Sequence, residues 1–85
     1  MDIEKKKGSS VERVLQLVET VAKSPRPISA GDLAAMLDIP KPSVHRLLQQ
    51  LQQTGFLQLD LQGKVICGQR THQLALNLWQ TSHYR

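Results

Sequence analysis

The sequence predicts a mostly α-helical fold that carries one small antiparallel β-hairpin. Apolar residues recur at three- and four-residue spacing in several segments, and two short apolar runs flank a glycine near position 63. Aromatic residues make up only 4% of the 85 residues, so aliphatic side chains must form the core. A chain of this length supports one core, which buries roughly 60% of the surface of the unfolded chain. We therefore expect a single domain.

The first helix is expected from about Ser10 to Lys23. Ser9 opens a capping box, because Glu12 lies three residues on and can reach back to the Ser9 amide. Behind this cap, apolar residues follow at helical spacing: Val11, Val14, Leu15, Val18, Val21 and Ala22. The preceding residues 1–8, MDIEKKKG, are predicted to be a flexible basic arm, and residues 9–70 the folded domain.

Two shorter signals predict the second and third helices. The SPRP stretch ends the first helix because proline lacks an amide donor, and Ser29 can cap a second helix that ends near Asp38. In the IPKP connector, Pro40 and Pro42 mark the start of a third helix, since proline is tolerated in a first helical turn. This third helix is expected to reach about Gln53, before Thr54-Gly55.

A hairpin and a last helix complete the expected order. FLQLD and KVICG are separated by LQG, so Gly63 can supply the turn between two short strands. From Thr71 a helical pattern begins whose apolar residues lie on two sides, with Leu74 and Leu78 on one and Leu76 and Trp79 on the other. Such a helix needs two partners. Trp79 could alternatively fold back onto the core of its own domain.

The second half of the chain is depleted in acids. Residues 1–38 hold six acidic and six basic residues, whereas from Ile39 onward five basic residues accompany the single acid Asp60, which accounts for the net charge of +4. The stretch from Lys41 to Leu59, KPSVHRLLQQLQQTGFLQL, contains no aspartate or glutamate. Chance could produce this asymmetry in a short chain, but its position on one predicted helix points to an anionic partner.

In a helical conformation, the polar residues of this acid-free stretch lie on one face of the third helix. If Val44, Leu47, Leu48 and Leu51 face the core, the opposite face holds Pro42, Arg46, Gln49 and Gln53, flanked by Ser43, His45 and Gln50. A carboxylate there would be repelled by phosphates, whereas Arg can bind guanine and Gln can bind adenine. The second and third helices form a helix-turn-helix, and the hairpin makes it a winged helix-turn-helix. The residues predicted to contact double-stranded DNA are Ser29, Lys41, Pro42, Ser43, His45, Arg46, Gln49, Gln50 and Lys64.

Other chemistry is weakly supported. The histidines and Cys67 lack metal-ligand spacing, so we expect no metal site. No glycine-rich phosphate loop is present and the acids are scattered, so we expect no cofactor and no enzymatic activity. The alternative is a winged helix that binds protein and not specific DNA. An RNA-binding function is less favoured because aromatic stacking residues are scarce. The absence of a secretory signal or a long apolar run, together with the lone cysteine, predicts a cytoplasmic location.

The order of these elements, and above all IPKPSVHRLLQQLQQTGFLQLD before a short hairpin, resembles the N-terminal winged-helix domain of the IclR family of bacterial transcription regulators. The resemblance covers about residues 9–80. It implies that Lys41, Ser43, His45 and Arg46 belong to the recognition helix, and that Val65 and Cys67 fill inward hairpin positions. One departure is Pro42, where the family commonly has serine. Proline offers no hydroxyl to a phosphate, so operator preference is expected to differ.

The resemblance also implies partners that the residues alone do not indicate. Members of the family bind operators as homodimers and carry a longer C-terminal domain that binds a small-molecule effector. Residues 71–85 then correspond to the start of a linker helix toward such an effector domain, with Leu76 and Trp79 in the dimer contact. The 85 residues are either an isolated DNA-binding domain or part of a longer protein, repressor or activator.

Overall fold

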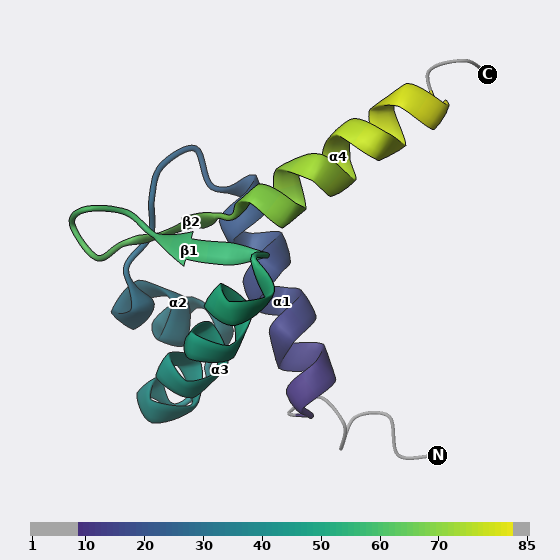
Figure 1. The fold of residues 1–85 in the computed structure, drawn as a ribbon. Helices are drawn as coiled ribbons and strands as arrows, with labels where there is room; N and C mark the ends of the chain where they lie inside the picture. Colours follow the sequence, from purple (N-terminus) through teal and green to yellow (C-terminus); the bar gives the residue numbers. More distant parts are fainter. Residues whose placement is uncertain (1–8, 83–85) are drawn as a thin grey trace, which may run out of the picture.

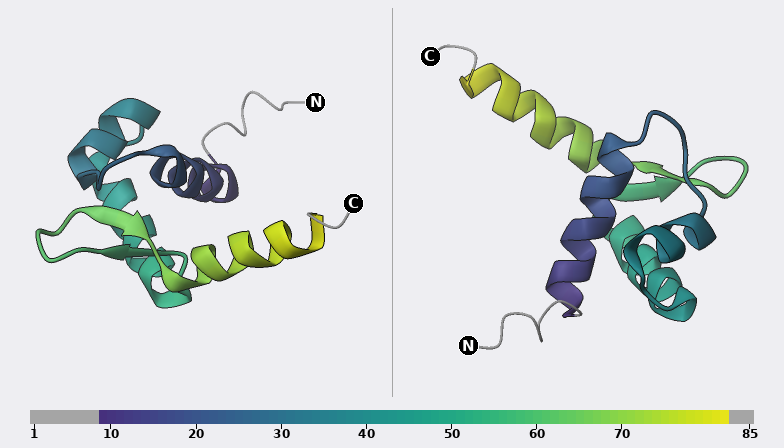
Figure 2. Two further views of the ribbon diagram at one scale, coloured as in Figure 1. Left: turned by 90° about the horizontal axis from the view of Figure 1, so that it is seen from above. Right: turned by 180° about the vertical axis from the view of Figure 1, so that it is seen from behind.

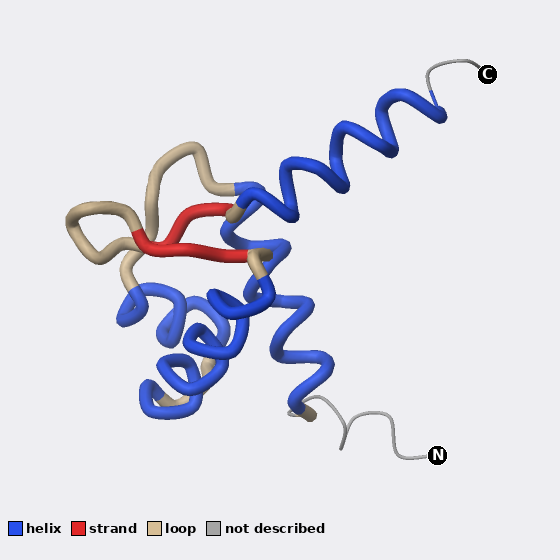
Figure 3. The backbone as a smooth tube through the Cα atoms, viewed as in Figure 1, coloured by secondary structure: helices blue, strands red, loops and turns tan. Residues whose placement is uncertain are grey.

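The computed structural model describes residues 9–82, and the predicted basic arm at residues 1–8 lies outside this range, as do residues 83–85. Within residues 9–82, three helices and a hairpin form a compact body from which a fourth helix projects (Figure 1, Figure 3). In chain order the elements are α1 (Ser10–Lys23), α2 (Ala30–Leu37), α3 (Lys41–Thr54), β1 (Leu57–Leu59), β2 (Val65–Cys67) and α4 (Gln69–Ser82). The predicted mostly α-helical fold with one antiparallel hairpin is confirmed.

The predicted helix ends are set by local hydrogen bonds. The Ser9 hydroxyl oxygen accepts from the Glu12 amide at 3.2 Å, and the Ser29 hydroxyl oxygen accepts from the Asp32 amide at 3.0 Å. Both serines satisfy an amide that has no partner inside its helix. Gly55 ends α3 with a φ of 87°, a left-handed conformation that glycine adopts without steric cost. These caps confirm the predicted starts of the first two helices and the end of the third within one residue.

The core is aliphatic, as the composition predicts. Leu17 of α1, Leu33 of α2, Val44 of α3 and the strand residues Leu57 and Val65 are essentially inaccessible to solvent. β1 packs on α3 and β2 packs on α1, so the hairpin covers one end of the three-helix body (Figure 2). The four apolar residues that were predicted to point inward from α3 are all buried: Val44, Leu47, Leu48 and Leu51.

A contact between distant segments supports the base of the hairpin. β1 and β2 pair antiparallel, with Leu59 opposite Val65. Val65 also forms a bridge with Ile28 on its other side, through N–H···O bonds of 2.7 and 3.2 Å. The proline-containing connector between α1 and α2 is therefore tied to the hairpin and does not hang free, which the local sequence did not predict.

α4 differs from the prediction at its start. It begins at Gln69, two residues before the expected Thr71, because the Gly68 carbonyl already accepts from the His72 amide at 3.2 Å. Beyond its first turn it extends away from the body (Figure 1). Its large apolar side chains are 49–60% exposed, and Trp79, at 60%, is not buried in the core of its own domain, contrary to the alternative. None of the helices in residues 9–82 is long and apolar enough to cross a bilayer.

Candidate nucleic-acid interface

The exposed side of α3 carries most of the residues singled out from the sequence. Pro42, His45, Arg46, Gln49 and Gln50 are all exposed, whereas Ser43 is half-buried. The helix begins at Lys41 with Pro42 in its first turn, where an amide would have had no partner. The sequence thus fixes both the start of the helix and the side that faces solvent.

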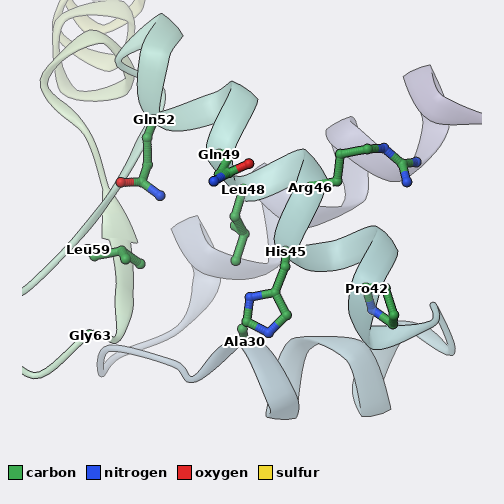
Figure 4. Close-up of a pocket in the computed structure, with 9 residues that line it drawn as sticks. All are labelled: Ala30, Pro42, His45, Arg46, Leu48, Gln49, Gln52, Leu59 and Gly63. Atoms are coloured by element: carbon green, nitrogen blue, oxygen red, sulfur yellow. The ribbon is translucent and has the colours of Figure 1, made fainter.

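A hollow of about 600 Å³ separates this side of α3 from the hairpin (Figure 4). The Gln49 and Gln52 side chains extend from α3, Leu59 and Gly63 lie on the hairpin wall, and His45 points toward the start of α2 (Figure 4). Arg46 lies on the rim and extends away from the hairpin (Figure 4). No aspartate or glutamate is among the lining residues, which are Ala30, Pro42, His45, Arg46, Leu48, Gln49, Gln52, Leu59 and Gly63.

Two further predicted residues, Lys41 and Ser29, lie near Gly31 at the start of α2. A Cβ atom built on Gly31 would lie 3.5 Å from Cε and 3.8 Å from Nζ of Lys41, and 3.9 Å from the Ser29 hydroxyl oxygen. The ammonium group therefore lies beside the first turn of α2, whose free amides carry partial positive charge. Lys41 and Ser29, twelve positions apart in the sequence, belong to one basic corner next to the hollow.

The hairpin turn at residues 60–64 forms the wing tip. Its one carboxylate, that of Asp60, accepts hydrogen bonds from within the turn. An Asp60 carboxylate oxygen accepts from the amides of Gln62 at 2.8 Å and Lys64 at 2.9 Å. The Asp60 amide donates to the Lys64 carbonyl at 2.8 Å, and Gly63 takes a φ of 79°. Asp60, the single acid after Ile39, thus shapes the turn. Lys64 is exposed beside it.

Two residues of the second half serve the structure. Arg70 stacks over the Phe56 ring at 4.8 Å from the centroid and donates to the Thr54 carbonyl at 3.2 Å, so it joins α4 to the end of α3. Burial raises the pKa of the Cys67 thiol above its usual value, which disfavours the thiolate form. Among the described residues, no cluster of three or more His, Cys, Asp or Glu side chains could hold a metal ion.

Gln52 and Leu59 are among the lining residues that the sequence analysis did not predict. Gln52 lies one helical turn after Leu48 and so falls at the edge of the core face, but the hairpin does not cover that edge. Leu59 shares a strand face with the fully buried Leu57, yet 42% of its surface is exposed because it lies beyond the end of the core. The three-residue spacing of Gln49 and Gln52 could have indicated that Gln52 lines the hollow. The exposure of Leu59 follows only from the tertiary structure.

Residues 10–61, more than half of the chain, match the helix-turn-helix domain of the IclR family. The chain belongs to the IclR family. The resemblance drawn from the recognition-helix segment is therefore confirmed, as is the winged helix-turn-helix fold. Two solved structures superimpose well on this IclR domain. HmgR of Pseudomonas aeruginosa aligns with a TM-score of 0.77 at 25% identity over 84% of this chain and 30% of its own. The repressor BlcR of Agobacterium tumefaciens aligns with a TM-score of 0.75 at 27% identity over 88% of this chain and 30% of its own.

A curated relative extends this result to the sequence level. A probable transcriptional regulator, SauR of Cupriavidus necator, is 28% identical over 72 residues, which are 84% of this chain and 29% of SauR. The chain therefore spans less than a third of the length of these IclR relatives. It is a DNA-binding domain of the kind found in IclR transcriptional regulators.

Proposed function

We propose that this domain binds a double-stranded DNA operator by placing α3 in the major groove and the wing tip against the adjacent groove or backbone. One observation carries the proposal: α3 and the hairpin border a single hollow that is lined by amides and cationic or neutral groups, with no carboxylate. A duplex presents closely spaced phosphates along both borders of each groove, so a surface without acids suits it. The width of the major groove, about 12 Å, admits one α-helix.

The residues divide into two roles within this proposal. Arg46 and Gln49 lie on the exposed side of α3 and carry the side chains best suited to guanine and adenine edges. Lys41 and Ser29, at the basic corner beside α2, and Lys64 on the wing tip suit phosphates. The other predicted contacts extend the same surface and have no separate role assigned: Pro42, Ser43, His45 and Gln50.

A homodimer on a roughly two-fold operator completes the proposal. Leu74, Leu76, Leu78 and Trp79 of α4 are 49–60% exposed, and their burial against a second copy would stabilise a dimer. Two such domains would then read half-sites about 34 Å apart, one turn of the duplex. A small-molecule effector would act only on a longer parent chain.

Binding to random duplex DNA tests the function itself. We expect a nonspecific Kd in the range of about 10⁻⁴ to 10⁻⁶ M at physiological salt, with affinity that falls steeply as salt rises because bound phosphates release their counterions. Fluorescence anisotropy of a labelled random duplex, titrated at several salt concentrations, measures both quantities. An affinity for DNA that is absent or insensitive to salt would favour the alternative of a protein-interaction module.

Lys64→Ala tests the contact between the wing tip and the backbone. The variant should weaken binding to all duplexes alike and reduce the magnitude of the salt slope by about 1, since it removes one phosphate contact and no base contact. Lys23→Ala, which removes the same charge from the exposed last turn of α1, is the matched control. Equal losses in the two variants would show that only the net charge matters at position 64.

A further inference from the structure

The wing tip is closed by hydrogen bonds among its own residues. The Asp60 carboxylate accepts hydrogen bonds from the amides of Gln62 and Lys64, the Asp60 amide donates to the Lys64 carbonyl, and Gly63 supplies the left-handed residue. Below the tip, the bridge between Ile28 and Val65 fixes the hairpin to the body. A turn with these internal bonds presents its remaining side chains in a defined place before any partner arrives.

Leu61 is the residue that this turn presents. Its side chain is completely exposed, at 106% of the reference surface, and it lies between Leu59 and Gly63, both of which border the hollow beside α3. Isolated exposed leucines are common on proteins, so exposure alone carries no argument. The argument rests on its position in a hydrogen-bonded turn, three residues from the exposed cation Lys64. Polar residues and glycine dominate turns, and leucine contributes nothing to the fold here.

The geometry of a B-form duplex would put Leu61 next to a minor groove. If α3 occupies a major groove, one backbone strand fills the hollow and the hairpin wall then faces the next minor groove, which is about 6 Å wide and 7.5 Å deep. Proteins that bind the minor groove frequently insert apolar side chains, leucine among them, between its base steps. Guanine places an amino group on the floor and would obstruct the side chain.

We infer that Leu61 inserts into the minor groove next to the segment read by α3, with Lys64 on the phosphates that border it, and that it favours A·T pairs there. The inference rests on the proposed DNA-binding function and deepens it by assigning an apolar, groove-reading contact to the wing. Lys64 would supply affinity for any duplex, whereas Leu61 would supply a preference for the flanking sequence.

Leu61→Ser tests the inference on duplexes selected from random sequence with the wild-type chain. Two versions of a selected site are compared, which differ only by A·T or G·C pairs at the flanking positions. Wild type should prefer the A·T flanks, and the variant should lose roughly tenfold in affinity for them and have little preference left, since partial burial of a leucine is lost. Its salt slope should equal that of wild type, because no charge is removed.

Two further variants make the result decisive. Leu61→Met keeps an apolar side chain and should retain both affinity and flank preference, while Leu15→Ser, which removes an exposed leucine from α1 outside the proposed interface, should change neither. If wild type binds the selected duplex but Leu61→Ser binds it equally well with the same flank preference, the inference is wrong and the proposed function stands. If wild type shows no salt-dependent affinity for DNA, both are wrong.

Discussion

Replacing Arg46 by glutamate should lower the affinity for a selected operator by more than about a hundredfold, because juxtaposed like charges cost several kcal/mol and each 1.4 kcal/mol is a factor of ten. Arg46 lies on the exposed side of α3, at the rim of a hollow whose lining contains no acid. A glutamate there would place a carboxylate where the proposed function puts the phosphates of the duplex. Anisotropy titrations of wild type and variant on the same duplex measure the loss.

Lys23→Glu and Arg46→Ala are the matched variants for this experiment. Lys23→Glu makes the same change in net charge on α1, away from the hollow, and should lose far less affinity. Arg46→Ala should cost about 1 to 3 kcal/mol on the selected site and relax the preference at one base pair. Equal losses for Arg46→Glu and Lys23→Glu would contradict the placement of α3 in the major groove. An unchanged specificity ratio for Arg46→Ala would limit Arg46 to the backbone.

Gly68→Ala should be the most disruptive of the single-methyl substitutions in the fold. A Cβ atom at this position would lie 2.2 Å from the Gly55 carbonyl oxygen and 2.9 Å from its carbon, so backbone atoms and not a flexible side chain would have to move. The same approach holds the Gly68 amide 2.8 Å from the Phe56 carbonyl. We expect a loss of about 2 to 3 kcal/mol in the free energy of unfolding, typical of a severe overpacking change.

Thermal unfolding followed by circular dichroism measures this loss, and two other glycines provide the comparison. In a domain of this size, 2 to 3 kcal/mol corresponds to a fall in Tm of roughly 10 to 20 °C. Gly31→Ala meets only ordinary contacts in the first turn of α2 and should be neutral or slightly stabilising. Gly63→Ala meets no atom but keeps a φ of 79°, so it should cost about 1 to 2 kcal/mol through backbone strain alone. A Tm for Gly68→Ala above that of Gly63→Ala would show that the end of α3 can yield easily.

The parts of the fold that the sequence predicts well are those set by neighbouring residues. Ser9, Ser29 and Gly55 act within three or four positions of themselves, so the helix ends that they control follow from the sequence. The inward and outward sides of α3 follow from the period of its leucines and glutamines. The turn at Gly63 follows from the spacing of two short apolar runs.

The parts that the sequence does not predict depend on contacts between distant segments. α4 begins early because Gly68 packs against Gly55, thirteen positions away, and no capping residue marks that start. The bridge from Ile28 to Val65 joins a loop to a strand with no local signal in either. For the same reason Gln52 and Leu59 were not predicted to line the hollow, since each is left exposed by where the hairpin lies over the helices.

The first turn of α4 is hydrogen-bonded to the end of α3 and to the residue that precedes β1. The Arg70 amide donates to the Gly55 carbonyl at 3.0 Å, the Thr71 hydroxyl donates to the Phe56 carbonyl at 2.6 Å, and Gly55 itself ends α3. A helix of this length is a stiff shaft of about 21 Å, since each residue adds about 1.5 Å. A displacement of its far end would therefore rotate α3 and the hairpin together with α4.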